Sequence, residues 1–526
     1  MRSIFGAAAS LLLAVSAEAA VKAFPTAEGF GAVSIGGRGG SIVFVTNLND
    51  SGPGSLRQAL QFTTGPRIVV FRVGGTITLT NVIRIIGESG SYVTIAGQTA
   101  PGGGIQLTGY GIQMENAHDI VIRHIRSRPR LSGVDSPNHL CGAISGLELL
   151  DSYNVVVDHS SFSWNIDEGV SSHAFSHDVT IQRSLIAEGI LDGKKDLPLS
   201  CGASGVDAKT LRFDRRNQRV DAHHNLLMTS RYRNPAVNGG DPRVINNLIY
   251  NWSMIPTQID SDNSFLTTPD VINNYYKHGP ETDGFTTGIK HPVYVLSQCT
   301  TALCSIHMAG NVVVNSSGGT PSFVNPTDNF SLATLQSGAA YTRRFTPHTI
   351  QPMHPMTIQT AVAARDSILV AGGVGATVPA RDSYDTKLIN DVINVRGTIP
   401  RKATVAALPI LSNGTPPIDS DNDGMPNTWE TAHGLNPGDP ADGPRTAANG
   451  YTNVENYLNA LAGDPVFASL PGDLHGDGAR TLIDVRWLIE MLVGSRDKTT
   501  VADLDHDGNV TLADCQALIR LLVGIP

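Results

Sequence analysis

The sequence is poor in aromatic residues and in positive charge. Aromatic residues make up 6% of the 526 residues, so the composition does not predict a sugar-binding cleft built from stacked rings. Lysine and arginine number 38 against 47 aspartate and glutamate residues, which gives a formal net charge of -9. Because phosphate binding needs a basic face, we expect no nucleic-acid partner.

Cysteine is also scarce, with five residues in the whole chain. Such a small number excludes a disulfide scaffold as the main source of stability. Cys299 and Cys304 are close enough in sequence to close a small loop, and a pair between Cys141 and Cys201 is open. We expect Cys515 to be a buried, unpaired thiol.

Long apolar runs are absent after the N-terminus. The first residues, MRSIFGAAASLLLAVSAEAA, combine an early arginine, an apolar run and small residues around an Ala-Glu-Ala sequence. This pattern predicts a secretory signal peptide over residues 1–20, which is too short to span a membrane. It fits a buried first helix less well. We therefore expect a soluble, secreted protein without a membrane span.

Glycine and proline are abundant instead, with 54 and 30 residues, and predict many turns. Between about residues 67 and 316, short segments rich in β-branched residues recur at offsets of about 22 to 41 residues, a spacing typical of solenoids. Examples are RIVVFRV, YNVVVDHSSF, HDVTIQRSLI and RVINNLIYNW. An antiparallel sandwich would instead show closely spaced strands joined by tight hairpin turns. The pattern favours an all-β fold, a right-handed parallel β-helix.

Two features support stacked coils. Asn225, Asn247, Asn274 and Asn311 recur at the ends of predicted strands, where side-chain amides can hydrogen-bond to one another and to the backbone. Near the start, SGPGSLRQAL offers Ser55 as the N-cap of an amphipathic turn. Such a turn would cover the open apolar end of the solenoid.

The segment SRYRNPAV places Arg231 and Arg233 two residues apart, just before Pro235. The proline and the residue before it are conformationally restricted, so the segment predicts a fixed cationic pair. Paired guanidinium groups suit recognition of a carboxylate or another planar anion.

Several motifs resemble the pectate lyase family, polysaccharide lyase family 1. They are VTNLNDSGPGSLRQAL, NVVVDHSSFSWNIDEGVS, and HHNLLMTSRYRNP followed by RVINNLIYNW, and they cover roughly residues 25–320. The resemblance implies a parallel β-helix that cleaves pectate (polygalacturonate) by β-elimination. In that reaction a proton leaves C5 of the uronate and the glycosidic oxygen leaves C4, and positive charge stabilises the developing anion.

The resemblance assigns the catalytic base to Arg233. Arginine normally stays protonated, so this role requires nearby positive charge from calcium or lysine to lower its pKa. If the segment is strand-like, Arg231 faces the same side and can bind a uronate carboxylate. For both arginines a purely structural ion pair is the alternative.

The family also implies a substrate-binding lysine and a second arginine. Lys194 and Lys195 match the lysine best, but the insertion that follows them makes Lys209 a rival. The second arginine falls on Asn238, so part of the substrate clamp is expected to differ.

The resemblance further implies a Ca²⁺ site in the cleft. Asp167 matches an acidic ligand position and Glu168 lies beside it, whereas two other expected acids fall on Ser145 and Ser171. Serine is a weaker calcium ligand than a carboxylate. The cleft is therefore predicted to bind calcium weakly, or only together with the substrate.

A second, independent calcium signal begins at residue 419, in DSDNDGMPNTWE. Asp419, Asp421, Asp423, Gly424 and Glu430 occupy loop positions one, three, five, six and twelve. This spacing wraps oxygen ligands around Ca²⁺ and places glycine at the sharp turn. A merely acidic linker is the alternative.

The last sixty or so residues contain an internal duplication, DLHGDGARTLID and DLDHDGNVTLAD, each followed by an apolar helix. The two units resemble a type I dockerin, which implies folding on calcium and a cohesin-type scaffold partner. The implied ligands are Asp473, Asp477, Asp484, Asp503, Asp505, Asp507 and Asp514. The implied docking positions are Leu482, Ile483, Leu512 and Ala513. A calcium-stabilised cap without a partner is the alternative.

Together these signals divide the chain into a signal peptide (1–20), a β-helix catalytic domain (21–408), a calcium-binding linker (409–465) and a dockerin-like tail (466–526). We expect a monomeric, secreted, calcium-dependent pectate lyase that its tail attaches to a scaffold or cell surface. Two other classes stay open. One is a β-helix glycoside hydrolase using paired carboxylates, although adjacent residues such as Asp167 and Glu168 point to opposite faces of a strand. The other is an inactive glycan-binding adhesin.

Overall fold

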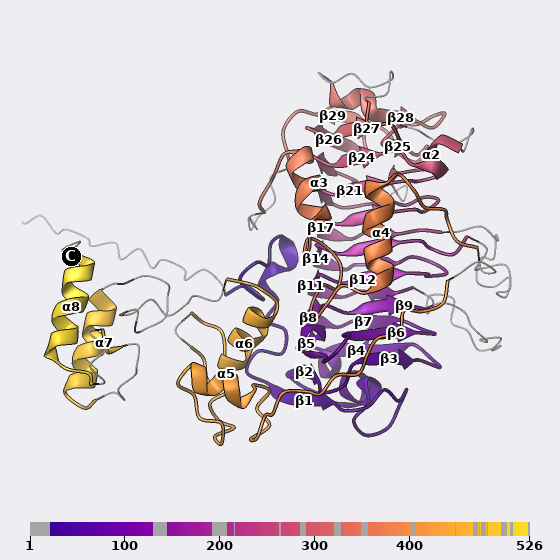
Figure 1. Ribbon diagram of the computed structural model, residues 1–526. Coiled ribbons are helices and arrows are strands. Elements are labelled where there is room, and N and C mark those ends of the chain that lie inside the picture. The colour runs from indigo at the N-terminus through magenta and orange to yellow at the C-terminus, as the bar shows by residue number, and fades with distance from the viewer. Residues whose placement is uncertain are drawn as a thin grey trace, which may run out of the picture.

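The computed structural model describes most of the chain from residue 21 onward. The described residues are 21–129, 145–191, 208–214, 216–261, 265–284, 291–319, 328–348, 356–401, 406–447, 449–465, 472, 474, 480, 482–495, 502–504 and 509–523. The predicted signal peptide lies outside them. Within them, three parallel sheets stack along one axis as a right-handed parallel β-helix (Figure 1). The predicted fold class is confirmed for this part of the chain.

Each coil of the β-helix contributes one strand to each sheet. In the described residues, sheet A consists of β1 Ser41–Val45, β2 Arg67–Phe71, β5 Val93–Ala96, β8 His118–Arg123, β11 Tyr153–Asp158, β14 His177–Gln182, β17 Gln218–His223, β20 Arg243–Ile245, β23 Asp270–Ile272, β26 Ser305–Ala309 and β29 Thr342–Arg344. Sheet B consists of β3 Gly75–Thr78, β6 Ile105–Thr108, β9 Arg126–Arg128, β12 Ser161–Ser163, β15 Leu185–Ala187, β18 Leu226–Met228, β21 Leu248–Tyr250, β24 Tyr275–Lys277 and β27 Val312–Val314. Sheet C consists of β4 Ile83–Ile86, β7 Ile112–Glu115, β10 Leu147–Leu150, β13 Val170–His173, β16 Leu211–Phe213, β19 Ala236–Asn238, β22 Thr257–Asp260, β25 Val293–Val295 and β28 Ala333–Leu335.

Helices are short and lie outside the coils. They are α1 Gly87–Gly90, α2 Pro280–Gly284, α3 Ala361–Leu369, α4 Ser383–Ile393, α5 Asn427–Ala432, α6 Asn453–Leu461, α7 Leu482–Leu492 and α8 Leu512–Leu522, with single turns η1 Phe30–Val33, η2 Gln58–Phe62, η3 Gly97–Thr99 and η6 Asn329–Leu332. Among the described residues, none of these helices is both long and apolar enough to span a bilayer.

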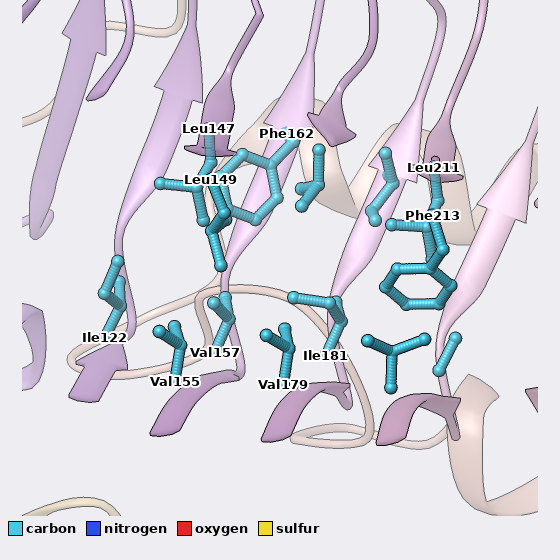
Figure 2. Close-up of a cluster of buried hydrophobic side chains, with 14 of the residues drawn as sticks. Ile122, Leu147, Leu149, Val155, Val157, Phe162, Val179, Ile181, Leu211 and Phe213 are labelled. Atoms are coloured by element: carbon cyan, nitrogen blue, oxygen red, sulfur yellow. The ribbon is translucent and has the colours of Figure 1, made fainter. Parts of the chain in front are cut away.

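The core of the β-helix is a set of apolar stacks that continue from coil to coil. Val155 pairs with Val179 and Val157 pairs with Ile181, and all four side chains point into one buried core (Figure 2). The next step keeps the same register, with Val179 opposite Val220, although the chain between them is longer. Burying each such side chain contributes about 1.5–3 kcal/mol. Segments of different length between strands therefore leave the register of the stack unchanged.

The predicted asparagine ladder is confirmed. Asn225, Asn247, Asn274 and Asn311 are bonded in series, each side-chain amide donating to the next side-chain oxygen at 3.0 Å. The series continues to Asn329, again at 3.0 Å. Each amide also donates to a backbone carbonyl of an earlier strand, so the ladder satisfies polar groups that the coil buries.

The open end of the β-helix is covered as predicted. Ser55 accepts a hydrogen bond from the Gln58 backbone amide at 3.1 Å, at the start of η2. Leu56, Ala59 and Leu60 from the same turn are buried in the apolar core. The amphipathic turn therefore shields the end of the stack from water.

Two helices pack along the outside of sheet B (Figure 1). Leu388 of α4 and Ile368 of α3 lie in one buried cluster with outward-facing residues of sheet B such as Leu226. Asp385, also from α4, accepts from Arg128 at 2.8 Å. The two helices cover sheet B, whereas the predicted site residues lie in the turns that lead from sheet B to sheet C.

The cysteine predictions hold for the residues that the structure describes. Cys299 and Cys304 form a disulfide. Cys515 is a free, buried cysteine. Cys141 and Cys201 lie outside the described residues.

Candidate functional site

Four of the residues singled out in the sequence meet on three successive coils, in the turns between sheet B and sheet C. Asp167 and Glu168 lie between β12 and β13, Lys209 lies before β16, and Arg233 lies between β18 and β19. Lys209 forms an isolated parallel bridge with Tyr232, and the Leu211 amide donates to the Arg233 carbonyl at 3.2 Å. Coil stacking therefore brings together residues that are up to 66 positions apart, Asp167 to Arg233.

A network of ion pairs holds these side chains. The Lys209 ammonium donates to Asp167 Oδ1 at 2.6 Å and lies 3.5 Å from Glu168 Oε1. Arg233 Nη1 donates to the same Glu168 oxygen. Because the Glu168 side chain is only 2% exposed, these pairs are screened little by solvent.

The charges of this network shift the pKa values of its members. Burial alone would raise the pKa of Glu168, but the positive charges of Lys209, Arg233 and Arg212 outweigh it and hold that pKa well below the usual range. Burial alone would lower the pKa of Arg233, but the negative charge of Glu168 outweighs it and raises that pKa. Without calcium in the cleft, the nearest charge to Arg233 is therefore a carboxylate that favours the protonated guanidinium.

A second row of polar side chains faces outward on the strands of sheet C. Register places Glu148 opposite Ser171, and Ser171 opposite Arg212. Arg212 donates to Asp214 at 2.6 Å and lies 3.8 Å from Glu168 Oε1. Through Arg212, the ion-pair network therefore extends onto the adjoining surface of sheet C.

Asn238 occupies the position at which the family's second arginine was expected. Its side-chain amide donates to Asp214 Oδ1 at 3.0 Å, and register places it opposite Asp260. Register places Arg212, one coil earlier, opposite Ala236, two residues before Asn238. Arg212 could have been found from the sequence, because it is the middle residue of the strand segment LRF, which begins two residues after Lys209.

The cleft residues do not fit a resident calcium ion. Asp167 and Glu168 are already bound by Lys209 and Arg233, and within the described residues no group of three metal-ligating side chains includes either carboxylate. Ser171 is fully buried and its hydroxyl has no hydrogen-bond partner among the described atoms. A calcium ion would need ligands from outside this set.

The substrate-binding predictions have mixed outcomes. Lys194 and Lys195 lie outside the described residues, whereas the rival Lys209 belongs to the ion-pair network. Arg231 is half-buried, and its segment is a turn in which Arg233 has a φ of 62°. The strand-like alternation expected for Arg231 and Arg233 is therefore wrong, and it gives no reason to place both side chains on one face.

The linker carboxylates converge as their spacing predicts. Asp419, Asp421 and Asp423 have ligand atoms within 4.8 Å of one another, and so do Asp423, Glu430 and Asp442. Burial, together with the negative charge of neighbouring carboxylates, raises the pKa values of Asp423 and Glu430 to about 7. Sequence reasoning missed Asp442, which lies beyond the twelve-residue loop pattern.

In the tail, the two duplicated units have matching contacts. Asp484 accepts from the Leu474 amide at 2.7 Å, and Asp514 accepts from the Leu504 amide at 2.6 Å. Helices α7 and α8 share one small apolar core. The remaining predicted ligands Asp473, Asp477, Asp505 and Asp507 lie outside the described residues, and Asp503 lies within them.

Comparison with known proteins identifies the family. Probable pectate lyase C from Aspergillus fumigatus is 32% identical over 465 residues, which cover 86% of this chain and 96% of the relative. Probable pectate lyase C from Aspergillus terreus is 34% identical over 447 residues, which cover 84% and 94%. The chain belongs to the pectate lyase family. It is therefore a polysaccharide lyase, and the network of Lys209, Glu168 and Arg233 lies on the β-helix of a lyase.

Other comparisons add less. No family model matches the chain. A pectate lyase from Bacillus sp. N165, solved in complex with trigalacturonate, is 19% identical and covers 65% of this chain and 96% of its own, with a TM-score of 0.42. The assignment to the pectate lyase family rests on the curated relatives.

Proposed function

We propose that this lyase cleaves pectate-like polyuronate by β-elimination at the network formed by Lys209, Glu168 and Arg233. The observation that carries the proposal is the gathering of three cations, with Arg212 as the third, around one buried carboxylate on adjacent coils. Positive charge fixed in place before the reaction is what abstraction of a proton next to a carboxylate needs.

In the proposed reaction, the base takes the C5 proton, the C–H electrons form the C4–C5 double bond, and the C4–O bond breaks. The departing oxygen then gains a proton. Cations near the uronate carboxylate stabilise the negative charge that develops on it. The Lys209 and Arg212 side chains suit this role, because both lie beside Glu168, at 3.5 and 3.8 Å from its Oε1.

Arg233 is the proposed base, and its contact with Glu168 controls whether its guanidinium is protonated. While Glu168 accepts from Arg233, the guanidinium stays protonated. Lys209 lies 3.5 Å from the same Glu168 oxygen, so it is an alternative partner for that carboxylate. We infer that substrate binding shifts Glu168 toward Lys209, so that Arg233 can release a proton to water before it takes the C5 proton.

Calcium dependence belongs to the proposal in a restricted form. Because Asp167 and Glu168 already bind cations of the protein, a calcium ion would enter the cleft only together with uronate carboxylates that supply its further ligands. Arg231, Lys194 and Lys195 stay candidates for binding the substrate.

Secretion and tethering complete the proposal. The N-terminal residues carry the signal-peptide pattern. Leu482 and Leu512, at equivalent points of the duplicated tail, are 80% and 72% exposed. Exposed apolar side chains at equivalent positions suit docking to a partner, so we infer that the tail attaches the enzyme to a cohesin-type scaffold or a cell surface.

The test is incubation of the full chain with polygalacturonate, following the ultraviolet absorbance of an unsaturated uronide with and without EDTA. Absorbance growth supports elimination, new reducing ends without absorbance mean hydrolysis, and neither means a binding protein. Arg233→Lys should abolish the absorbance. The matched control is Arg219→Lys, because Arg219 pairs with Asp178 on sheet A, away from the network.

A further inference from the structure

The segment after the β-helix contains a cluster of carboxylates that its own hydrogen bonds do not satisfy. Both carboxylate oxygens of Glu430 and of Asp421 are buried without a hydrogen-bond partner among the described atoms, as are Asp423 Oδ2 and Asp442 Oδ1. Glu430 is 0% exposed, and Asp423 and Asp442 are each 3% exposed. Buried carboxylates without partners are strongly unfavourable as charged groups, and a bound cation would remove this penalty.

These side chains form two overlapping groups. Asp423 belongs to both groups of ligand atoms that lie within 4.8 Å of one another, one with Asp419 and Asp421 and the other with Glu430 and Asp442. The two groups of three share Asp423, so the five residues form one continuous cluster.

The backbone of the loop is fixed in a conformation that suits the cluster. Asp419 accepts from the amides of Asn422 and Gly424 at 2.7 and 3.1 Å. Gly424 has a φ of 94°, which only glycine adopts readily, at the sixth position of the loop. The turn carries the chain into α5, whose Glu430 then faces back toward the aspartates.

We propose that Asp419, Asp421, Asp423, Glu430 and Asp442 bind one calcium ion that fastens residues 419–464 to the outer face of sheet A. Oxygen-only ligands exclude a typical zinc site, which uses nitrogen and sulfur. Several carboxylates in a flexible cage suit Ca²⁺ better than Mg²⁺, which keeps most of its waters. Asp442 supplies the ligand that the loop pattern alone lacks, from twelve residues beyond Glu430.

The site is coupled directly to the β-helix. Asp419 pairs with Arg72, immediately after β2, at 2.9 Å. Met425, next to Gly424, is fully buried against Ile68 and Val70, the outward-facing residues of β2. An ion that holds the loop in shape therefore also holds Met425 in its place on sheet A.

The rest of the segment is anchored further along the same face, where α5 and α6 lie beside β1 to β8 in Figure 1. Val454 and Leu458 of α6 join the cluster with Ile68 and Val70. Beyond α6, Asp464 accepts from the buried Arg123 at 2.7 Å. With the ion bound, these contacts cover apolar side chains that sheet A would otherwise expose.

The test is hydrogen exchange of the full chain, read peptide by peptide, so that the tail loops and the cleft do not contribute to the signal. In wild type, chelation of calcium should raise the exchange rates of amides in 425–435 and 453–461 by tenfold or more, and added calcium should restore slow exchange. Magnesium alone should not. If chelation leaves these peptides unchanged, the proposed site is wrong.

Asp442→Asn tests the new ligand. Asparagine keeps an oxygen that can accept the hydrogen bond from the Asn436 backbone amide, which lies 2.8 Å from Asp442 Oδ2. It removes one negative charge from the ligands of the ion. The calcium concentration that protects 453–461 should rise about tenfold, since charge count tunes calcium affinity. The matched control is Asp439→Asn, whose Oδ1 accepts from the Ala441 amide outside the cluster. The role of Asp442 as a ligand would be overturned if Asp442→Asn left the midpoint calcium concentration unchanged. It would also be overturned if exchange in the variant stayed fast at every calcium concentration.

Discussion

Replacing Lys209 with methionine tests the centre of the proposed mechanism, because methionine preserves volume and removes the charge. Lys209 is buried and lies 2.6 Å from Asp167 and 3.5 Å from Glu168. At an effective dielectric constant of about 20, the attraction across the longer distance is about 5 kcal/mol before desolvation is counted. Removing one partner of a buried pair has a measured penalty of about 3–5 kcal/mol. Because Asp167 is partly exposed, we expect a loss near 3 kcal/mol.

The effect on catalysis should exceed what this destabilisation explains. Without Lys209, Arg212 at 3.8 Å is the remaining alternative cation for Glu168, and we expect the carboxylate to stay bound to Arg233. Removing one preorganised charge-stabilising group typically lowers kcat by about 100- to 1000-fold. We expect a fall of that size at temperatures where the variant is fully folded.

Two assays check these values. Urea denaturation gives the change in the free energy of unfolding, and the ultraviolet absorbance of the unsaturated product gives kcat and KM. Lys194→Met and Lys195→Met are the matched controls, because the sequence offered both lysines for the same role. If Lys209→Met keeps kcat within about twofold of wild type while either control loses it, the assignment of Lys209 is refuted.

Three further predictions follow from other parts of the molecule. Arg233→Lys should abolish elimination, because an ammonium group cannot reproduce the planar guanidinium, while urea denaturation changes little; retained activity would refute its role. Asn247→Ala should lower the free energy of unfolding by about 2–4 kcal/mol, since it leaves several buried ladder bonds unmade, and a change below about 0.5 kcal/mol would contradict the ladder's importance. A shortened chain ending at residue 465 should keep activity and stability, whereas one ending at residue 408 should be less stable because it uncovers the outer face of sheet A; equal melting temperatures would argue against that contact.

The repeating architecture was predictable because its signals are local and periodic. β-branched segments recur along the chain, and Asn225, Asn247, Asn274 and Asn311 mark equivalent positions of successive coils. In-register stacking then follows, since each coil buries its apolar residues only against the same residues of its neighbours. The loop from Asp419 was predictable for the same reason, because its ligand spacing is contained in twelve consecutive residues.

The candidate site was predictable only in part. The motif around Arg233 pointed to one turn between sheet B and sheet C, but the choice between Lys194, Lys195 and Lys209 was not decided, because an insertion separates these lysines. The carboxylate that raises the pKa of Arg233 could not be predicted from the motif. It belongs to Glu168, which lies 65 residues earlier in the chain and is brought into contact by coil stacking.

The sequence by itself determined the fold class and the carboxylate spacing of the loop from Asp419, because periodicity and spacing are properties of consecutive residues. Only the tertiary structure decided which charges touch. It gave Lys209 and Arg233 the same carboxylate as partner, and it brought Asp442 to the linker loop. Electrostatic energies depend on distance and burial, and both are set by how the coils and the linker pack against one another.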